Sequence, residues 1–196
     1  MTINLHQFSG VASGILTLAG LLLYTKSVVA GPTKPSQATW TIWAINALLL
    51  LTSYDASGAK ETVWLAAGYA AGLAIISLLT IKFGEKGWNR LDRFCLLGAA
   101  MGGFLWWITG SPLTALSASL IIDLFGVIPT IQKSWYHPEE EDKLAWSILL
   151  WGGLMSLLAI EKWSLVIIAY PIQITVTTAI IVLFLFFRHP SQNANP

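Results

Sequence analysis

The stretch YTKSVVAGPTKPSQATW at Tyr24–Trp40 has a counterpart in TIQKSWYHPEEEDKLAW at Thr130–Trp146. When the two are aligned, Pro32 falls on Pro138 and the final tryptophans coincide. Each stretch carries a Lys-Ser pair upstream of its proline, although the pairs are one residue out of register. Each stretch also leaves one apolar run and enters another, which predicts that one helical unit occurs twice in the chain.

The composition indicates a membrane protein. The chain has 196 residues, of which 55% are hydrophobic and 11% charged, and its mean hydropathy is +0.66. A soluble domain carries about 25% charged residues, so this chain lacks the polar material for a water-facing surface. Its apolar runs approach the ~20 residues that a helix needs to cross a bilayer. The net charge of +1 provides no basic surface for a nucleic acid.

Hydropathy predicts a polytopic, all-α integral membrane protein with seven spans. Ser111-Pro112 is typical of an N-cap followed by proline at the first helical position. His137-Pro138, which precedes four acidic residues, is typical of another helix start. The spans are expected near Phe8–Val29, Thr39–Tyr54, Thr62–Ile81, Leu91–Thr109, Pro112–Lys133, Leu144–Ile160 and Ser164–Phe187.

The basic residues predict the orientation of these spans. Lys60 and Lys162 would lie on one side of the membrane, whereas nine others would lie on the opposite side. Cytoplasmic loops carry an excess of Lys and Arg, so the N-terminus is expected outside and the C-terminus in the cytoplasm. The nine cytoplasmic residues are Lys26, Lys34, Lys82, Lys86, Arg90, Arg93, Lys133, Lys143 and Arg188.

The two copies of the unit are expected to point the same way across the membrane. The fifth span takes the place of the first, four spans later, which makes the repeat parallel. The match extends to Trp64 and Tyr69 in the third span and to Trp163 and Tyr170 in the seventh, where the spacing differs. We therefore expect four parts: a first repeat at 1–83, a linker helix at 84–110, a second repeat at 111–188 and a polar tail at 189–196.

At this point the chain resembles the superfamily of SWEET, PQ-loop and PnuC transporters. TKSVVAGP at Thr25–Pro32 and IPTIQKSWYHP at Ile128–Pro138 are similar to the ends of the first helix in the two SWEET repeats. WTIWAIN at Trp40–Asn46 is similar to the WxxW pattern of PnuC-like proteins, although its Asn comes one residue early. The chain also lacks a Pro-Gln dipeptide. The resemblance implies a multi-pass protein of the bacterial inner membrane.

Asp123 is the first candidate functional residue. It lies about ten residues from the cytoplasmic end of its span, which places it roughly 15 Å deep. A carboxylate there costs at least ~2.5 kcal/mol, and intramembrane acids are commonly functional. Asp123 is therefore a candidate for substrate binding or proton coupling, and the resemblance to PQ-loop transporters implies proton coupling. The alternative is a structural acid bonded to a neighbouring hydroxyl.

Other polar residues are expected at a similar depth. Thr17 is the repeat equivalent of Asp123, and Asn46 and Gln173 lie midway along the second and seventh spans. Amide side chains in hydrocarbon need partners, which are either another helix or a bound substrate. Gly152, the equivalent of Asn46, either leaves room for a ligand or permits close packing of helices.

Aromatic side chains are candidates for stacking on a sugar or a heterocyclic ring. Trp43 shares a helix face with Asn46, and Trp151 also lies deep in its span. Tyr69 and Tyr170, which lie in equivalent helices, would supply phenol hydroxyls. We predict that all four contribute to the substrate site. Trp40 and Trp146 lie nearer the cytoplasmic side, where they either join the interfacial aromatic belt or close a pocket.

Pro129 and Pro171 each remove a helical hydrogen bond, so they are candidate hinges for rocking or simply static kinks. We expect no cofactor, because His6, His137 and His189 are far apart and Cys95 is the only cysteine. No paired carboxylates or nucleophile–base constellation indicates an enzyme.

The favoured function is a facilitator or proton-coupled carrier of a small polar solute, such as a sugar or a nucleoside-like vitamin precursor. The expected partners are that solute, the lipid bilayer and a proton, without nucleic acid and in an oligomeric state left open. The alternative is a receptor or assembly factor that does not transport, as the KDEL receptors on the same fold imply.

Overall fold

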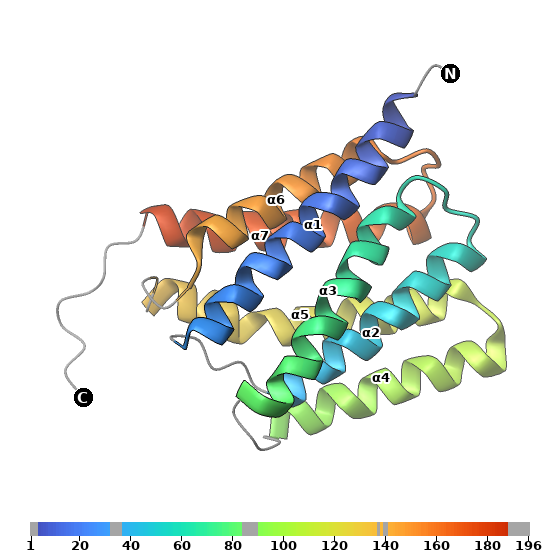
Figure 1. The fold of residues 1–196 in the computed structure, drawn as a ribbon. Coiled ribbons are helices and arrows are strands. Elements are labelled where there is room, and N and C mark those ends of the chain that lie inside the picture. The colour runs from blue at the N-terminus through green and yellow to red at the C-terminus, as the bar shows by residue number, and fades with distance from the viewer. Residues whose placement is uncertain (1–3, 32–36, 84–89, 137, 139–140, 188–196) are drawn as a thin grey trace.

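The computed structural model describes residues 4–31, 37–83, 90–136, 138 and 141–187 (Figure 1). These residues form seven α-helices and no strand. The predicted polar tail at 189–196 lies outside them. The helices are α1 (Leu5–Ala30), α2 (Gln37–Ala56), α3 (Val63–Phe83), α4 (Arg90–Thr109), α5 (Pro112–Tyr136), α6 (Lys143–Leu158) and α7 (Leu165–Phe187).

Each of the seven predicted apolar segments forms one helix. α5 begins at Pro112, as the Ser-Pro signal predicts. α6 begins at Lys143, one residue before the predicted start at Leu144, and the helix start predicted at His137-Pro138 lies largely outside the described residues. Asp142 is the N-cap of α6, and its side chain accepts hydrogen bonds from the backbone N–H groups of Leu144 and Ala145. The last acid of the run therefore satisfies two of the free donors of the first turn.

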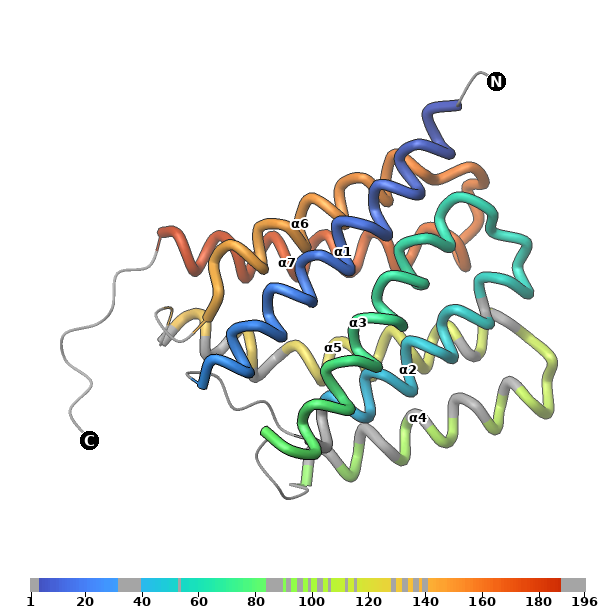
Figure 2. Tube along the Cα trace, viewed as in Figure 1, coloured from blue at the N-terminus to red at the C-terminus, as the bar shows by residue number. Residues whose placement is uncertain are grey.

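The helices form two triplets in which the third helix lies between the other two. α3 packs against α1 and α2, and α7 packs against α5 and α6 (Figure 2). The triplets meet through α1 against α6 and through α2 against α5. α4 packs against α5 and α2 along one edge of the bundle (Figure 1). The space enclosed by both triplets is the part of the fold that matters for the site.

Small residues allow α1 to approach both neighbours closely. An ideal Cβ on Gly68 of α3 would lie 2.6 Å from the carbonyl oxygen of Gly14 on α1. An ideal Cβ on Gly152 of α6 would lie 2.7 Å from Oγ1 of Thr17. Backbones at such distances gain dispersion energy without large side chains, a packing mode typical of helices in lipid.

The outward faces of the helices are apolar. Trp107 of α4 is 81% exposed, Phe187 of α7 79% and Leu78 of α3 69%. Within the described residues, three helices (α1, α3 and α7) are long and apolar enough to cross a membrane, judged by length and composition. An apolar exterior of this extent is compatible with a helical membrane protein.

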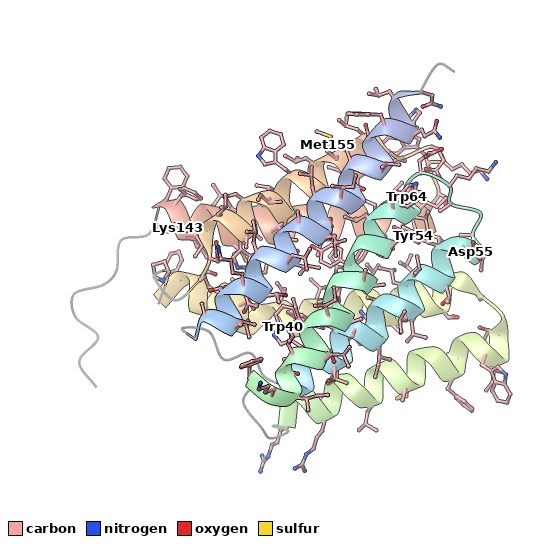
Figure 3. All side chains as sticks on the ribbon, in the orientation of Figure 1. Trp40, Tyr54, Asp55, Trp64, Lys143 and Met155 are labelled. Atoms are coloured by element: carbon pink, nitrogen blue, oxygen red, sulfur yellow. The ribbon has the colours of Figure 1, made fainter. Side chains whose placement is uncertain are left out.

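The bundle has two distinguishable ends. Asp55 and Trp64 lie at the end where α1 begins, whereas Trp40 and Lys143 lie toward the end where α1 finishes (Figure 3). We call these the α1-start end and the α1-finish end.

Candidate functional site

A cavity of about 60 Å³ lies between the two triplets. One water molecule occupies about 10–15 Å³ on this measure, so the space holds a few waters or a small ligand group. Helices α1, α2, α3, α5, α6 and α7 all contribute to it, and none of the α4 side chains that the structure describes does. Its lining comprises Leu21, Tyr24, Trp40, Trp43, Tyr69, Leu73, Asp123, Val127, Trp146, Leu149, Tyr170, Gln173, Ile174, Thr177 and Thr178.

Aromatic rings form most of the polarisable wall of the cavity. On one side, the ring of Trp40 lies 5.1 Å from Tyr24 and 5.5 Å from Trp43, measured between centroids. On another side, the rings of Tyr69 and Tyr170 lie 6.1 Å apart in an edge-to-face arrangement. Such contacts hold the rings in fixed orientations and therefore preorganise the wall.

Trp43 owes its position to a missing side chain on α5. An ideal Cβ on Gly126 would collide with the Trp43 indole, which shows that the ring lies directly on the α5 backbone. Since Asn46 lies one helical turn further along α2, both side chains face α5.

Asp123 is the single carboxylate in the lining described above. Asn46 is 2% exposed and donates from Nδ2 to Asp123 Oδ1 at 3.0 Å and to the Ser119 carbonyl oxygen at 3.2 Å. Asn46 is therefore a supporting residue behind Asp123 rather than a lining residue. Its own Oδ1 is buried without a hydrogen-bond partner.

Gln173 connects the cavity to the helix that carries Asp123. Its Nε2 donates to the Leu120 carbonyl oxygen of α5 at 3.1 Å. Asp123 lines the same cavity as Tyr69 and Tyr170. The carboxylate, the Gln173 amide and the two phenols are thus polar groups of one largely apolar cavity.

The structure brings five predicted site residues to the cavity and leaves others away from it. Trp151 is 56% exposed on the outside of α6 and does not reach the cavity. Thr17 is fully buried against Gly152. Pro171 is buried within α7, and Pro129 lies within the range of α5. The five lining residues are Trp43, Tyr69, Asp123, Tyr170 and Gln173.

Sequence reasoning missed three lining residues that carry a hydroxyl group, Tyr24, Thr177 and Thr178. Tyr24 stands at the start of the repeated stretch and lies three residues after Leu21 on the same face of α1. Thr177 and Thr178 follow Gln173 by about one helical turn, so the cavity lining extends along one face of α7 toward its C-terminal end. Helical spacing from Gln173, which the sequence already identified, would have found Thr177 and Thr178.

The α1-start end is tied together by hydrogen bonds between the triplets. The Glu161 carboxylate accepts from the Lys60 backbone N–H at 2.7 Å and from the Thr62 hydroxyl. Tyr54 donates from its hydroxyl to the Ile167 carbonyl oxygen at 2.8 Å. Burial opposes ionisation of Glu161, but the hydrogen bonds outweigh it and hold the pKa of Glu161 below its ordinary value.

Searches of protein-family models, of curated proteins and of solved structures each found no match to this chain. Within the described ranges, no three His, Cys, Asp or Glu side chains cluster as metal ligands would.

Proposed function

We propose that this protein is a carrier for a small polar solute, such as a sugar or a nucleoside-like vitamin precursor, in the manner of SWEET-like transporters. The solute binds in the cavity between the triplets, and the triplets rock to expose it to either side of the membrane. The observation that carries the proposal is an aromatic cavity with one carboxylate at the interface of two similarly built helix triplets.

The packing of the helices supports a parallel repeat. Replacing α1, α2 and α3 by α5, α6 and α7 maps the α1–α3 and α2–α3 contacts onto α5–α7 and α6–α7. The same exchange maps the α1–α6 contact onto α5–α2. A parallel repeat with a pseudo-twofold axis along the membrane normal requires this pattern. The seven-span arrangement, with the N-terminus outside and α4 as the linker, belongs to the same proposal.

The lining of the cavity follows the same alignment. Matching Pro32 with Pro138 also pairs the lining residues Trp40 with Trp146 and Trp43 with Leu149. Tyr69 of α3 and Tyr170 of α7, which lie in equivalent helices but not at aligned positions, contact each other directly. Contact between the third helices of the two triplets is expected beside a twofold axis, where carriers of this plan bind their solute.

The distribution of contacts supports a state that is closed at the α1-start end. Glu161 and Tyr54 bridge the triplets there through hydrogen bonds to Thr62 and Ile167. The lining residues Trp40 and Trp146 instead lie early in α2 and α6, toward the α1-finish end. Alternating access would break the former contacts when the cavity opens to the α1-start side.

A ligand screen on the purified protein tests the proposal. Thermal stability is measured with sugars, nucleosides, vitamin precursors and amino acids at acidic and neutral pH. A ligand at 100 times its dissociation constant adds ~2.7 kcal/mol of stability, which is a readily measured shift. Trp43→Ala should abolish the shift because the ring forms part of the wall. Uptake of the stabilising ligand into proteoliposomes then tests transport itself.

Trp151→Ala is the matched control for this screen. It removes the same side chain from an exposed position outside the cavity, so the ligand shift should remain. A panel without any stabilising ligand would contradict the carrier proposal. If Trp43→Ala and Trp151→Ala lose the stabilisation by ligand equally, the proposed location of the binding site is contradicted.

A further inference from the structure

We propose that the solute is a small organic cation whose positive group binds between Asp123 and the aromatic wall. This inference rests on the proposed carrier function and narrows its substrate class. It comes from the charge and ring content of the cavity.

The cavity holds one potential negative charge and no positive side chain. Asp123 is the acid, and the described residues of the lining include no Lys, Arg or His. A single N–H donor, Nδ2 of Asn46 at 3.0 Å, contacts the carboxylate. An ionised carboxylate in an apolar site needs a countercharge, because burial without one costs several kcal/mol. The described lining residues do not supply that charge, so we infer that a cation from outside brings it.

The aromatic wall favours the same class of ligand. Six lining residues are aromatic: Tyr24, Trp40, Trp43, Tyr69, Trp146 and Tyr170. The faces of such rings carry negative electrostatic potential and attract an ammonium group, most strongly when water is excluded. The same rings with the carboxylate would repel an anionic solute. A neutral solute would gain stacking energy but would leave the carboxylate without a countercharge.

A proton and the organic cation would compete for the same carboxylate. The groups that face Asp123 from the helices around it are uncharged at neutral pH: Tyr69 of α3, Tyr170 of α7 and Asn46 of α2. Arg90 and Arg93, the described basic residues of α4, do not line the cavity. Glu141 lies at the α1-finish end, where its carboxylate accepts from Trp146 Nε1 at 2.8 Å. Acidification should therefore release the cation through Asp123, which would couple its movement to a proton in the opposite direction.

The small volume limits the cation. A cavity of about 60 Å³ holds only a few waters or a small ligand group, so a small cationic headgroup suits it better than a large solute such as a disaccharide. We therefore expect a compact ligand in which the charge is the main recognition element.

Choline and its uncharged isostere 3,3-dimethylbutan-1-ol provide the test. The two molecules have nearly the same shape, so a difference in binding reports the positive charge. We expect choline, tetramethylammonium or a small primary amine to raise the melting temperature of the full-length protein in detergent at neutral pH, and the isostere to have no effect. Asp123→Asn should weaken cation binding at least about tenfold, and Trp151→Ala should leave it unchanged.

The pH dependence keeps the test decisive if Asp123→Asn does not fold. In the unmodified protein, cation affinity should decrease as the pH is lowered and the carboxyl becomes protonated. The decrease should approach a limit of about tenfold per pH unit. Equal binding of choline and its isostere, or cation binding that ignores both Asp123 and pH, would overturn the proposal. A neutral ligand that binds in a Trp43-dependent way would overturn the cation class while leaving the carrier proposal intact. Absence of binding by every cation and every neutral compound would overturn both.

Discussion

At the scale of single residues, the Asn46–Asp123 pair determines whether an acid can lie in the cavity at all. The hydrogen bond from Nδ2 to Oδ1 satisfies one carboxylate oxygen from the α2 side. The second donation, to the Ser119 carbonyl oxygen, fixes the amide against α5. Asn46 therefore positions the carboxylate and leaves its other face toward the cavity.

A double-mutant cycle measures this pair. We expect Asn46→Ala, Asp123→Asn and their combination to give a coupling of about 1 kcal/mol in unfolding free energy, since polar pairs between membrane helices contribute about this much. Thermal or denaturant unfolding in one detergent provides the measurement. Gln173→Ala with Asn46→Ala is the control pair, because no hydrogen bond joins those side chains. A coupling as large in the control pair would contradict a specific Asn46–Asp123 interaction.

Glu161 should make the stability of the α1-start end depend on pH. Its folded-state pKa lies below the ordinary value of 4.5, although burial works against this shift. The folded state therefore favours the ionised form. The resulting stabilisation is complete above the ordinary pKa and disappears as the pH falls through the lower, folded-state pKa.

We expect acidification below about pH 5 to lower the melting temperature more in the unmodified protein than in Glu161→Gln. Asp55→Asn is the control, since Asp55 is an exposed acid at the same end of the bundle (Figure 3). If acidification lowers the melting temperature equally in the unmodified protein and in Glu161→Gln, ionised Glu161 does not stabilise the α1-start end.

Part of the candidate site follows from sequence, since depth alone selects Asp123 and Gln173. Which face of a helix points inward is harder to predict. Trp151 was predicted to line the site together with Trp43. The repeat alignment, however, places Leu149 on Trp43, two residues before Trp151. Residues two apart lie on nearly opposite faces of a helix, so Leu149 lines the cavity and Trp151 faces outward.

At the scale of helices, glycine determines how closely α1 and α3 approach. Gly68→Ala would place a Cβ 2.6 Å from the Gly14 carbonyl oxygen, and a backbone atom cannot move aside as a flexible side chain can. We expect a loss of about 1–3 kcal/mol in unfolding free energy, measured by thermal unfolding. Gly98→Ala on α4 is the control, because its nearest contact is a side-chain carbon at 3.4 Å. Equal stability of the two variants would show that the α1–α3 contact tolerates a Cβ at position 68.

Helix positions were predictable because seven apolar runs are separated by short polar segments. The start of α6 was less predictable, because any residue of an acidic run can serve as an N-cap. Asp142 takes that role since its side chain reaches the N–H groups of Leu144 and Ala145. The sequence of α1 or of α6 taken alone does not indicate that the two helices pack together. This packing depends on Gly20 and Gly152, which accommodate Leu149 and Thr17 of the facing helix.

At the scale of the whole molecule, the two triplets are related in packing but differ at the polar position. The alignment that places Thr17 on Asp123 also places Gly152 on Asn46. Both pairs occupy an interface between triplets, but the Asn46–Asp123 pair is polar and linked by a hydrogen bond, whereas Gly152 packs tightly on Thr17. A fully symmetric pair of triplets would hold two acids or none. The asymmetry gives the cavity one charge, which suits a solute with one charged group.

The placement of basic residues gives the molecule a direction that can be measured. Lys60 lies between α2 and α3 at the α1-start end, and Lys143 begins α6 at the opposite end. Both residues are exposed. In a background of Cys95→Ser, we expect Lys60→Cys to react with a membrane-impermeant maleimide in intact cells. Lys143→Cys should react only after the membrane is permeabilised, because positive residues are retained in the cytoplasm. The reverse pattern would invert the orientation, and labelling of both variants in intact cells would contradict an odd number of crossings between the α1 start and α6.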